Sequence, residues 1–441
     1  MEAIDLLIDA RWVIPVNPAM RVLEEHSVAV HAGRIVAVLP HAEAQAAYRA
    51  AERIELANHA LIPGMVNLHT HAAMTLLRGY ADGLPLSQWL QQRIRPAEAK
   101  HVSPRFVYDG TLLACAEMLR GGITCFNDMY LYPGDAARAA LAMGMRAAIG
   151  LVVIDLPTAY ANDADDYVAK GLELRDALRE QELLSFCMAP HAPNSVSDKT
   201  FSRLITLAEE LDLPVHMHLH ETEDEIARSL AQYGLRPLQR LQRLGLVGPN
   251  LIAVHAINVT PEEIALLAKN GSSVAHCPSS NLKFANGFAP VARMLDVGLN
   301  VGLGTDGAAS NNRLDLFQEM RLAALLAKAV SGDAAALPAH GALAMATLDG
   351  ARALRLDHAI GSIEAGKFAD LAAVEFTAPE MQPTYDPISQ IVYAAGRENV
   401  SHVWVAGRLL VEERTLKAHP KNDLENLAVL WQNRLSMETK A

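Results

Sequence analysis

The sequence contains little cysteine, and its four cysteines lie far apart. Cys115, Cys125, Cys187 and Cys277 form no CxxC pair. Thiolate zinc sites use closely spaced cysteines, and small secreted domains held by disulfides are rich in them. The pattern therefore argues against a thiolate zinc site and against a disulfide-held domain, and it favours reduced thiols in a cytoplasmic protein.

The sequence also lacks a long apolar run and an excess of positive charge. Uncharged stretches such as 334–348 are short, rich in alanine and interrupted by Pro338, whereas a membrane-spanning helix needs about 20 apolar residues. The opening "MEAIDLLIDA" has no basic segment of the kind that begins a signal peptide. The formal net charge of −12 disfavours nucleic acid and anionic membranes as partners.

The remaining composition predicts a globular α/β protein. Hydrophobic residues make up 51% of the chain and charged residues 20%, as in ordinary folded domains. From residue 61 onward, eight short apolar runs alternate with helical segments rich in Ala, Leu, Glu and Arg. Nearly continuous apolar runs are typical of parallel strands that are buried on both faces. Eight such repeats predict a (β/α)8 TIM barrel over residues 61–358.

Short strand signals without helical periodicity occupy both ends of the chain. They fill residues 1–60 and return after residue 358 in "AIGSIEAGKFADLAAVEF" and "VSHVWVAGRLLVEE". The simplest interpretation joins residues 1–60 and 359–441, the latter including a tail, into one small β-sandwich domain beside the barrel.

Polar residues end nearly every predicted barrel strand. In barrels of this kind the active site forms where the strands end. "NLHTH" places His69 and His71 two residues apart, on one face of the first strand. Such a pair suits a divalent metal ion. The full set of strand-end residues is His69, His71, Asp128, Asp155, His191, His218, His255, His276 and Asp306.

Three histidines alternate in the fifth strand, "LPVHMHLHE", and Glu221 follows them. His216, His218 and His220 all point to one face, because side chains alternate along a strand. Alternation alone leaves open which of them binds a metal, since a hydrogen-bonded core histidine is an ordinary alternative. The HxH pair and the "GTDG" of the eighth strand shift the interpretation toward a metal site.

Six segments together carry a resemblance to a known family. They are "PGMVNLHTH" (63–71), "HLHETEDE" (218–225), "VHAINV" (254–259), "HCPSSNLKFANG" (276–287), "GLGTDGAASNNRLDLFQEM" (302–320) and "GSIEAGKFADLAAV" (361–374). With them the chain resembles the amidohydrolase superfamily, in the branch of aminohydrolases that act on adenine nucleosides and triazines. Within this branch it most resembles the deaminases of 5′-methylthioadenosine and S-adenosylhomocysteine.

The resemblance implies one metal ion and a set of ligands. The family's ligand on strand five stands three residues before a glutamate, which selects His218 over His216 and makes Glu221 the acid–base group. The fourth strand contains no lysine that could bridge a second ion. Zinc is the expected ion and ferrous iron the alternative. The implied ligands are His69, His71, His218 and Asp306.

The resemblance also implies roles around the metal. Asp306 would accept a proton from the attacking water, His255 would hold that water, and Glu221 would protonate a ring nitrogen. The implied substrate is a small nucleoside, and a homo-oligomer is expected. The expected substrate contacts are Trp89 to the base, Glu98 and His191 to the ribose, and Ser310 to the five-membered ring, beside Glu221 and Asp306.

Other functions compete with this one. A guanine, pterin or triazine aminohydrolase would share the fold, but a bare heterocycle offers nothing to the ribose-directed Glu98 and His191. A non-catalytic scaffold would have no use for a complete ligand set. Trp89 also fits an ordinary amphipathic helix. Some relatives bind the carboxylate of S-adenosylhomocysteine with an arginine after strand three, whereas residues 147–169 contain no Lys or Arg.

Overall fold

Two eight-stranded β-sheets organise the computed structural model, which describes residues 1–418 and 421–436. Eight parallel strands in sequence order build the barrel. The barrel closes where Thr305 and Asp306 donate backbone hydrogen bonds of 3.1 and 3.0 Å to the carbonyl of His69. The predicted (β/α)8 barrel is therefore confirmed. Its strands are β5 (Met65–Thr70), β6 (Ile123–Asp128), β7 (Arg146–Val153), β8 (Leu184–Pro190), β9 (Val215–Leu219), β10 (Leu251–His255), β11 (Ser273–His276) and β12 (Asn300–Leu303).

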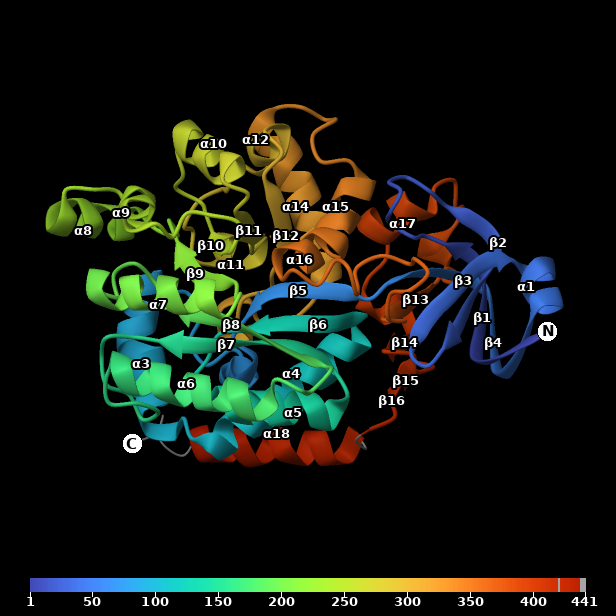
Figure 1. The fold of residues 1–441 in the computed structure, drawn as a ribbon, viewed down its shortest axis with the longest axis horizontal. Helices are drawn as coiled ribbons and strands as arrows, with labels where there is room; N and C mark the ends of the chain where they lie inside the picture. The colour runs from blue at the N-terminus through green and yellow to red at the C-terminus, as the bar shows by residue number, and fades with distance from the viewer. Residues whose placement is uncertain (419–420, 437–441) are drawn as a thin grey trace.

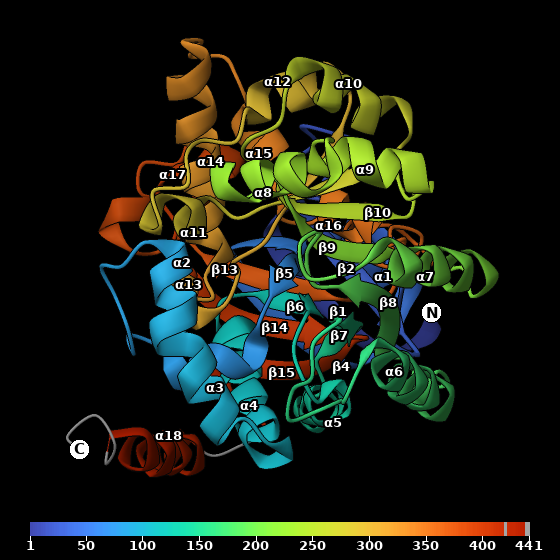
Figure 2. The ribbon, with the colours of Figure 1, turned by 90° about the vertical axis from the view of Figure 1, so that its left-hand side faces the viewer.

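Helices between the strands surround the barrel (Figures 1 and 2). Apolar side chains on their inner faces meet the outer faces of the strands in one continuous core. They are α4 (Pro104–Arg120), α5 (Pro133–Met143), α6 (Ala164–Leu178), α7 (Asp198–Glu210), α8 (Glu223–Tyr233), α9 (Pro237–Leu244), α10 (Pro261–Lys269), α11 (Pro278–Lys283), α12 (Val291–Asp296), α13 (Ala308–Asn311), α14 (Leu316–Ser331), α15 (Ala339–Met345) and α16 (Leu348–Ala353).

Both ends of the chain form the second sheet, as expected. Its strands are hydrogen-bonded in the single order β16-β15-β14-β13-β4-β1-β2-β3, rather than divided between two separate sheets. N-terminal β4 pairs with C-terminal β13 and thereby joins the two ends. The strands are β1 (Glu2–Val13), β2 (Leu23–His31), β3 (Arg34–Pro40), β4 (Tyr48–Pro63), β13 (Leu371–Glu375), β14 (Val400–Val405), β15 (Arg408–Glu412) and β16 (Thr415–Leu416). Short helices α1 (His41–Ala47), η3 (Pro379–Met381), α17 (Pro387–Tyr393) and η4 (Arg397–Asn399) connect them.

The C-terminal tail forms helix α18 (Lys421–Ser436), which leaves the terminal sheet and packs on the barrel beside α4 (Figure 1). Trp431 anchors it. The Trp431 side chain is buried, and its Nε1 donates a 2.9 Å hydrogen bond to Asp109 Oδ2. Its ring meets Phe106 edge-on at 5.2 Å between centroids, within the range of about 4.5–7 Å that is typical of aromatic pairs.

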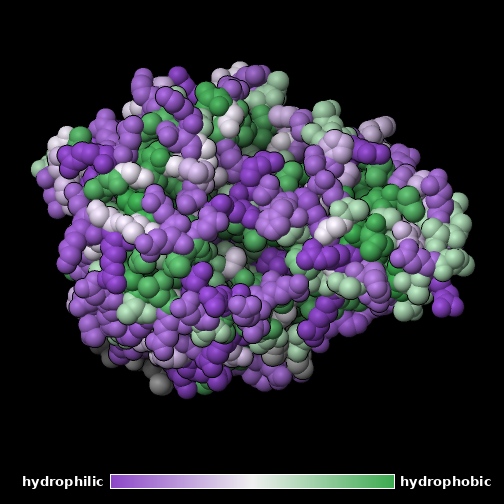
Figure 3. Space-filling model, viewed as in Figure 1, coloured by the Kyte–Doolittle hydropathy of each residue, from purple (hydrophilic) through white to green (hydrophobic). Residues whose placement is uncertain are grey.

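The barrel strands end on the side away from the terminal sheet, and Figure 2 looks onto that end. A cover helix lies there, made of α2 (Leu86–Trp89), the π-helical turn η2 (Leu90–Ile94) and α3 (Arg95–His101). It follows the short η1 (Ala72–Leu77). Hydrophilic side chains cover most of the face in Figure 3, with scattered hydrophobic areas over both the barrel and the terminal sheet. Within the described part of the chain, no helix combines the length and apolar character needed to cross a membrane.

Candidate metal centre and active site

Three imidazoles and one carboxylate meet where the barrel strands end. His69 and His71 lie at the end of β5, His218 near the end of β9, and Asp306 just after β12. Asp306 Oδ1 lies 3.5 Å from His69 Nε2 and 3.3 Å from His71 Nε2. The ring centroids of His69 and His218 are 5.0 Å apart. The structure thus brings all four expected ligands together.

Hydrogen bonds at Nδ1 orient two of these imidazoles. His71 Nδ1 lies 2.5 Å from the carbonyl of Met129, and His218 Nδ1 lies 2.8 Å from the carbonyl of His191. A carbonyl only accepts, so each Nδ1 carries the proton and each Nε2 keeps a lone pair. Histidines that bind metals typically have their second ring nitrogen held in this way.

His69 is held by His216. The Nδ1 atom of His69 lies 2.9 Å from Nε2 of His216. His69 Nε2 is buried and has no hydrogen-bond partner among the described residues. A buried polar nitrogen without a partner costs free energy, which a coordinated metal ion would recover. The orphaned Nε2 and the donor set therefore fit a divalent metal ion, with His216 as support.

Burial sets the protonation of this cluster. It lowers the pKa of His69 to about 3 and that of His218 well below its ordinary value, so both rings are neutral, the form that binds metals. Burial alone would raise the pKa of Asp306, but its neighbours His69 and His71 hold that pKa well below the usual range. Ser280 Oγ donates to Asp306 Oδ2 at 2.6 Å. Asp306 is therefore ionised.

His255 and Glu221 lie beside the four ligands. Nitrogens of His69, His218 and His255 lie within 4.8 Å of one another, so His255 shares the cluster. His255 Nε2 is 3.8 Å from Glu221 Oε1, and its Nδ1 is 2.9 Å from Asn281 Oδ1. Burial raises the pKa of Glu221. A carboxyl whose proton affinity is raised in this way suits proton transfer near neutral pH.

Strained backbone aims two of these side chains. His255 has a φ of 70° and Asp306 a φ of 58°. L-residues other than glycine rarely adopt such positive φ angles, and where they do the surrounding structure must hold them there. The strain lies at the point where each chain segment leaves its strand and turns its side chain toward the cluster.

The cover helix contributes Trp89 and Glu98. Trp89 is buried against Phe284, with 4.9 Å between ring centroids, and its indole N–H has no partner among the described residues. Glu98 accepts a 2.7 Å hydrogen bond from Tyr130 Oη. Burial raises the pKa of Glu98. The hydrogen bond from Tyr130 acts against this and lowers the pKa, as do the positive charges of neighbouring groups, Arg95 among them.

The other two expected substrate contacts also lie close to the cluster. The ring of His191 is 4.8 Å from that of His218. Burial lowers the pKa of His191 to about 4, and the charges of neighbouring groups, including Arg95, act in the same direction. Ser310 is buried on α13 and donates a 2.9 Å hydrogen bond to the carbonyl of Gly307, next to Asp306.

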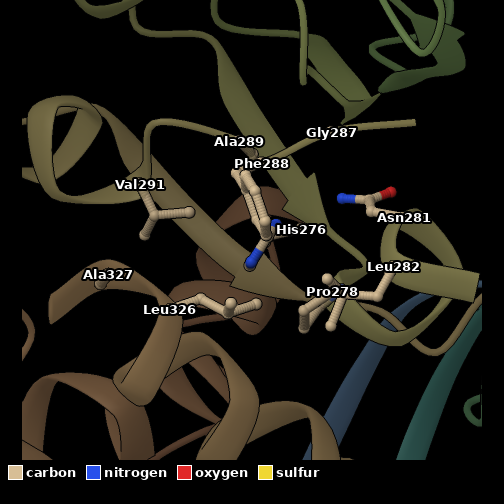
Figure 4. Close-up of a pocket in the computed structure, with 10 residues that line it drawn as sticks. All are labelled: His276, Pro278, Asn281, Leu282, Gly287, Phe288, Ala289, Val291, Leu326 and Ala327. Carbon is tan, nitrogen blue, oxygen red and sulfur yellow. The ribbon is translucent and has the colours of Figure 1, made fainter. Parts of the chain in front are cut away.

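Three of the strand-end residues have surroundings other than the cluster. Asp128 accepts a 2.7 Å hydrogen bond from the Ala72 backbone, and Asp155 accepts one of 2.7 Å from the Ser197 backbone at the start of α7. His276 faces a separate pocket between α11 and α14, whose wall includes Phe288 (Figure 4). Asp128 and Asp155 thus fix the starts of η1 and α7 rather than enter the cluster.

Several residues that support the site were not singled out by sequence reasoning. Ser280, Asn281 and Asn286 lie within the quoted motif "HCPSSNLKFANG" but carried no assigned role. Asn286 Nδ2 donates to Glu221 Oε1 at 3.3 Å. Nothing in their spacing reveals these partners, because each contact joins segments far apart in the sequence.

Comparison with known proteins agrees with this geometry. The family model described as the amidohydrolase family matches residues 60–410. The chain belongs to the amidohydrolase family. A 5-methylthioadenosine/S-adenosylhomocysteine deaminase of Teredinibacter turnerae is 46% identical over 432 residues, which cover 98% of each chain.

Solved structures extend the likeness. The crystal structure of an adenosine deaminase from Xanthomonas campestris with bound zinc is 51% identical, covers 99% of both chains and has a TM-score of 0.98. E. coli guanine deaminase is 24% identical, covers 94% of this chain and 100% of its own, and has a TM-score of 0.81. At that identity the second likeness concerns the fold alone.

Proposed function

We propose that this protein is a metal-dependent deaminase of 5′-modified adenosines, namely 5′-methylthioadenosine and S-adenosylhomocysteine, and that it releases ammonia. The carrying observation is the convergence of His69, His71, His218 and Asp306 with Glu221 beside them. The name of the Teredinibacter turnerae relative, at 46% identity over nearly the full length, supports the choice of substrate.

His69, His71, His218 and Asp306 would hold the metal ion. Three neutral nitrogens and one carboxylate suit zinc, with ferrous iron as the alternative. The Xanthomonas campestris structure, which contains bound zinc, supports zinc. A divalent ion bound here would supply electrostatic activation, since such ions lower the pKa of water from 15.7 to about 7.

Three side chains would then move protons. Asp306, ionised and hydrogen-bonded by Ser280, accepts the proton of the attacking water. His255, held by Asn281, orients that water through Nε2. Glu221, whose pKa is raised by burial, donates a proton to the purine ring nitrogen as the water oxygen adds to the amine-bearing carbon. Loss of ammonia leaves a 6-oxopurine.

The cover helix and β8 would bind the nucleoside. Glu98 is suited to the ribose because a carboxylate accepts two hydrogen bonds from a diol, and the same charge repels a 5′-phosphate. His191 provides the second sugar contact, beside His218. Trp89 would lie against the base, and Ser310 would contact its five-membered ring.

Ammonia release from five compounds tests the proposal: methylthioadenosine, S-adenosylhomocysteine, adenosine, guanine and melamine. We expect the first two to give the highest kcat/KM. Turnover of guanine or melamine in preference to the nucleosides would favour the competing aminohydrolase functions. No turnover of any compound by protein loaded with metal would favour a scaffold. The homo-oligomer stays a prediction, which light scattering tests.

A further inference from the structure

The turn that carries Glu221 is held by a buried carboxylate outside the active site. Glu225, in the first turn of α8, has only 7% of its surface exposed. Its Oε1 accepts the backbone N–H of His220 at 3.0 Å, and its Oε2 accepts the backbone N–H of Glu221 at 3.0 Å. Both oxygens therefore accept hydrogen bonds from two of the three residues between β9 and α8.

A second loop holds the same turn from its carbonyl side. Asn258, after β10, donates from Nδ2 to the carbonyl of Glu221 at 3.1 Å. The backbone N–H groups of Ile257 and Asn258 donate to the carbonyl of His220 at 3.1 and 3.0 Å. The peptide groups on both sides of Glu221 are thus fixed, whereas the Glu221 side chain has a single hydrogen bond among the described residues, the 3.3 Å contact from Asn286.

Helix capping alone does not account for Glu225. The cap of α8 is Thr222, whose hydroxyl accepts the Glu225 backbone N–H at 3.2 Å. The Glu225 carboxylate instead reaches back past the cap to the two preceding residues. His220 there has a φ of 55°, a conformation that needs support from its surroundings. Burial raises the pKa of Glu225 to about 7. An ionised carboxylate at this buried position therefore costs free energy that an exposed one would not.

We propose that Glu225 is a positioning residue for the deamination: its two hydrogen bonds aim Glu221 at the ring nitrogen that receives the proton. The proposal rests on the proposed deaminase function. A shift of about 1 Å in a proton donor costs rate rather than binding, because the donor acts mainly in the transition state. Loss of Glu225 should therefore lower kcat and spare KM.

Glu225→Gln is the direct test because it preserves size. The amide oxygen can accept one N–H, but the amide NH2 then opposes the other N–H donor. We expect kcat for methylthioadenosine to fall roughly 10- to 100-fold, with KM within about threefold and metal content unchanged. We also expect a larger solvent deuterium isotope effect on kcat, since proton delivery by Glu221 becomes slower.

Two matched variants separate positioning from helix stability and from charge. Ser229→Ala removes the 2.8 Å hydrogen bond from Ser229 Oγ, in the same helix as Glu225, to the carbonyl of Leu235 beyond the C-terminal end of that helix. Glu223→Gln removes one exposed charge from the first turn of α8. Both should keep the wild-type kcat and isotope effect. If Glu225→Gln does not fold, Asn258→Ala opens the same turn from its other side and should give the same split.

Specific outcomes would overturn the positioning role or the proposed function. Wild-type kcat in Glu225→Gln or, where that variant fails to fold, in Asn258→Ala would overturn the proposal, as would a kcat loss equal to that of Ser229→Ala. A wild-type protein that deaminates no adenosine derivative would instead overturn the proposed function, and the positioning role with it.

Discussion

His216 and His218 lie two residues apart on one strand, yet the structure gives them opposite surroundings. His218 Nδ1 meets a backbone carbonyl, which leaves Nε2 for the metal. His216 uses Nε2 for His69, and its Nδ1 is buried without a partner among the described residues. The proposed metal ligand and its proposed support thus differ in their hydrogen bonds rather than in residue type.

This difference predicts opposite effects on metal content. His218→Asn should release most of the bound ion because it removes a ligand nitrogen. His216→Asn should retain most of it, because the amide oxygen of the new asparagine can still accept a hydrogen bond from His69 Nδ1. We expect metal affinity to fall by about 10- to 100-fold at most. Metal analysis after gel filtration measures both. Loss of metal from His216→Asn alone would reverse the assignment.

Glu221→Gln separates proton transfer from metal binding. Glutamine keeps the size and the hydrogen bond from Asn286 but transfers no proton. We expect full metal content with a fall in kcat of about 10²- to 10⁴-fold. Steady-state deamination of methylthioadenosine measures it, and a variant with near-normal kcat would remove Glu221 from its role.

The identity of the site residues was predictable from the sequence where they belong to a motif. The hydrogen-bond partners that orient them were not predictable. The expected ligands came from strand-end positions and the family pattern, and all four converge in the structure. The acceptors at Nδ1 are backbone carbonyls of Met129 and His191. Any residue supplies such a carbonyl, so no sequence pattern marks them.

At the scale of elements, the cover helix carries two of the side chains that we propose to contact the nucleoside. Trp89 and Glu98 flank the π-helical turn η2, and Arg95 begins α3 one turn before Glu98. A π-helical turn shifts the angular position of the residues that follow and is common at functional sites. The sequence leaves an amphipathic helix open here as an alternative, but it does not reveal this shift.

Arg95 supplies a positive charge that the segment 147–169 lacks. Arg146, just before that segment, is buried against Asp370 at the opposite end of the barrel. We expect Arg95→Met to lower kcat/KM for S-adenosylhomocysteine by roughly 10- to 100-fold and to leave methylthioadenosine within about twofold, because only the former substrate carries a carboxylate.

Arg93→Met is the matched control, since it removes an equal charge from η2 of the same cover helix. It should leave the ratio of the two kcat/KM values unchanged. An unchanged ratio in Arg95→Met, or an equal loss on both substrates, would contradict a specific role for Arg95.

At the scale of the whole molecule, a buried ion pair joins the barrel to the terminal sheet. Arg146 at the start of β7 donates from Nε to Asp370 Oδ2 at 2.9 Å, next to β13. The Ala406 backbone donates to Asp370 Oδ1 at 2.7 Å. Sequence alone predicted that both termini share one β unit, but not this joint, which links residues 224 positions apart.

Removal of one partner leaves the other charge buried. We expect Arg146→Met to lower the free energy of unfolding by about 3–5 kcal/mol. Arg138→Met, which removes the exposed ion pair with Asp135, should cost at most about 1 kcal/mol. Urea unfolding of both variants measures the difference, and equal small losses would show that the joint contributes little.

In the proposed function, one metal ion at the end of the barrel enables deamination. The most direct test of this role is metal content and methylthioadenosine turnover measured on the same samples, during removal of metal by a chelator and its return as zinc. We predict that activity rises in proportion to bound ion and reaches its maximum at about one ion per chain, as the four-ligand set requires. Full turnover by protein without metal would contradict the account.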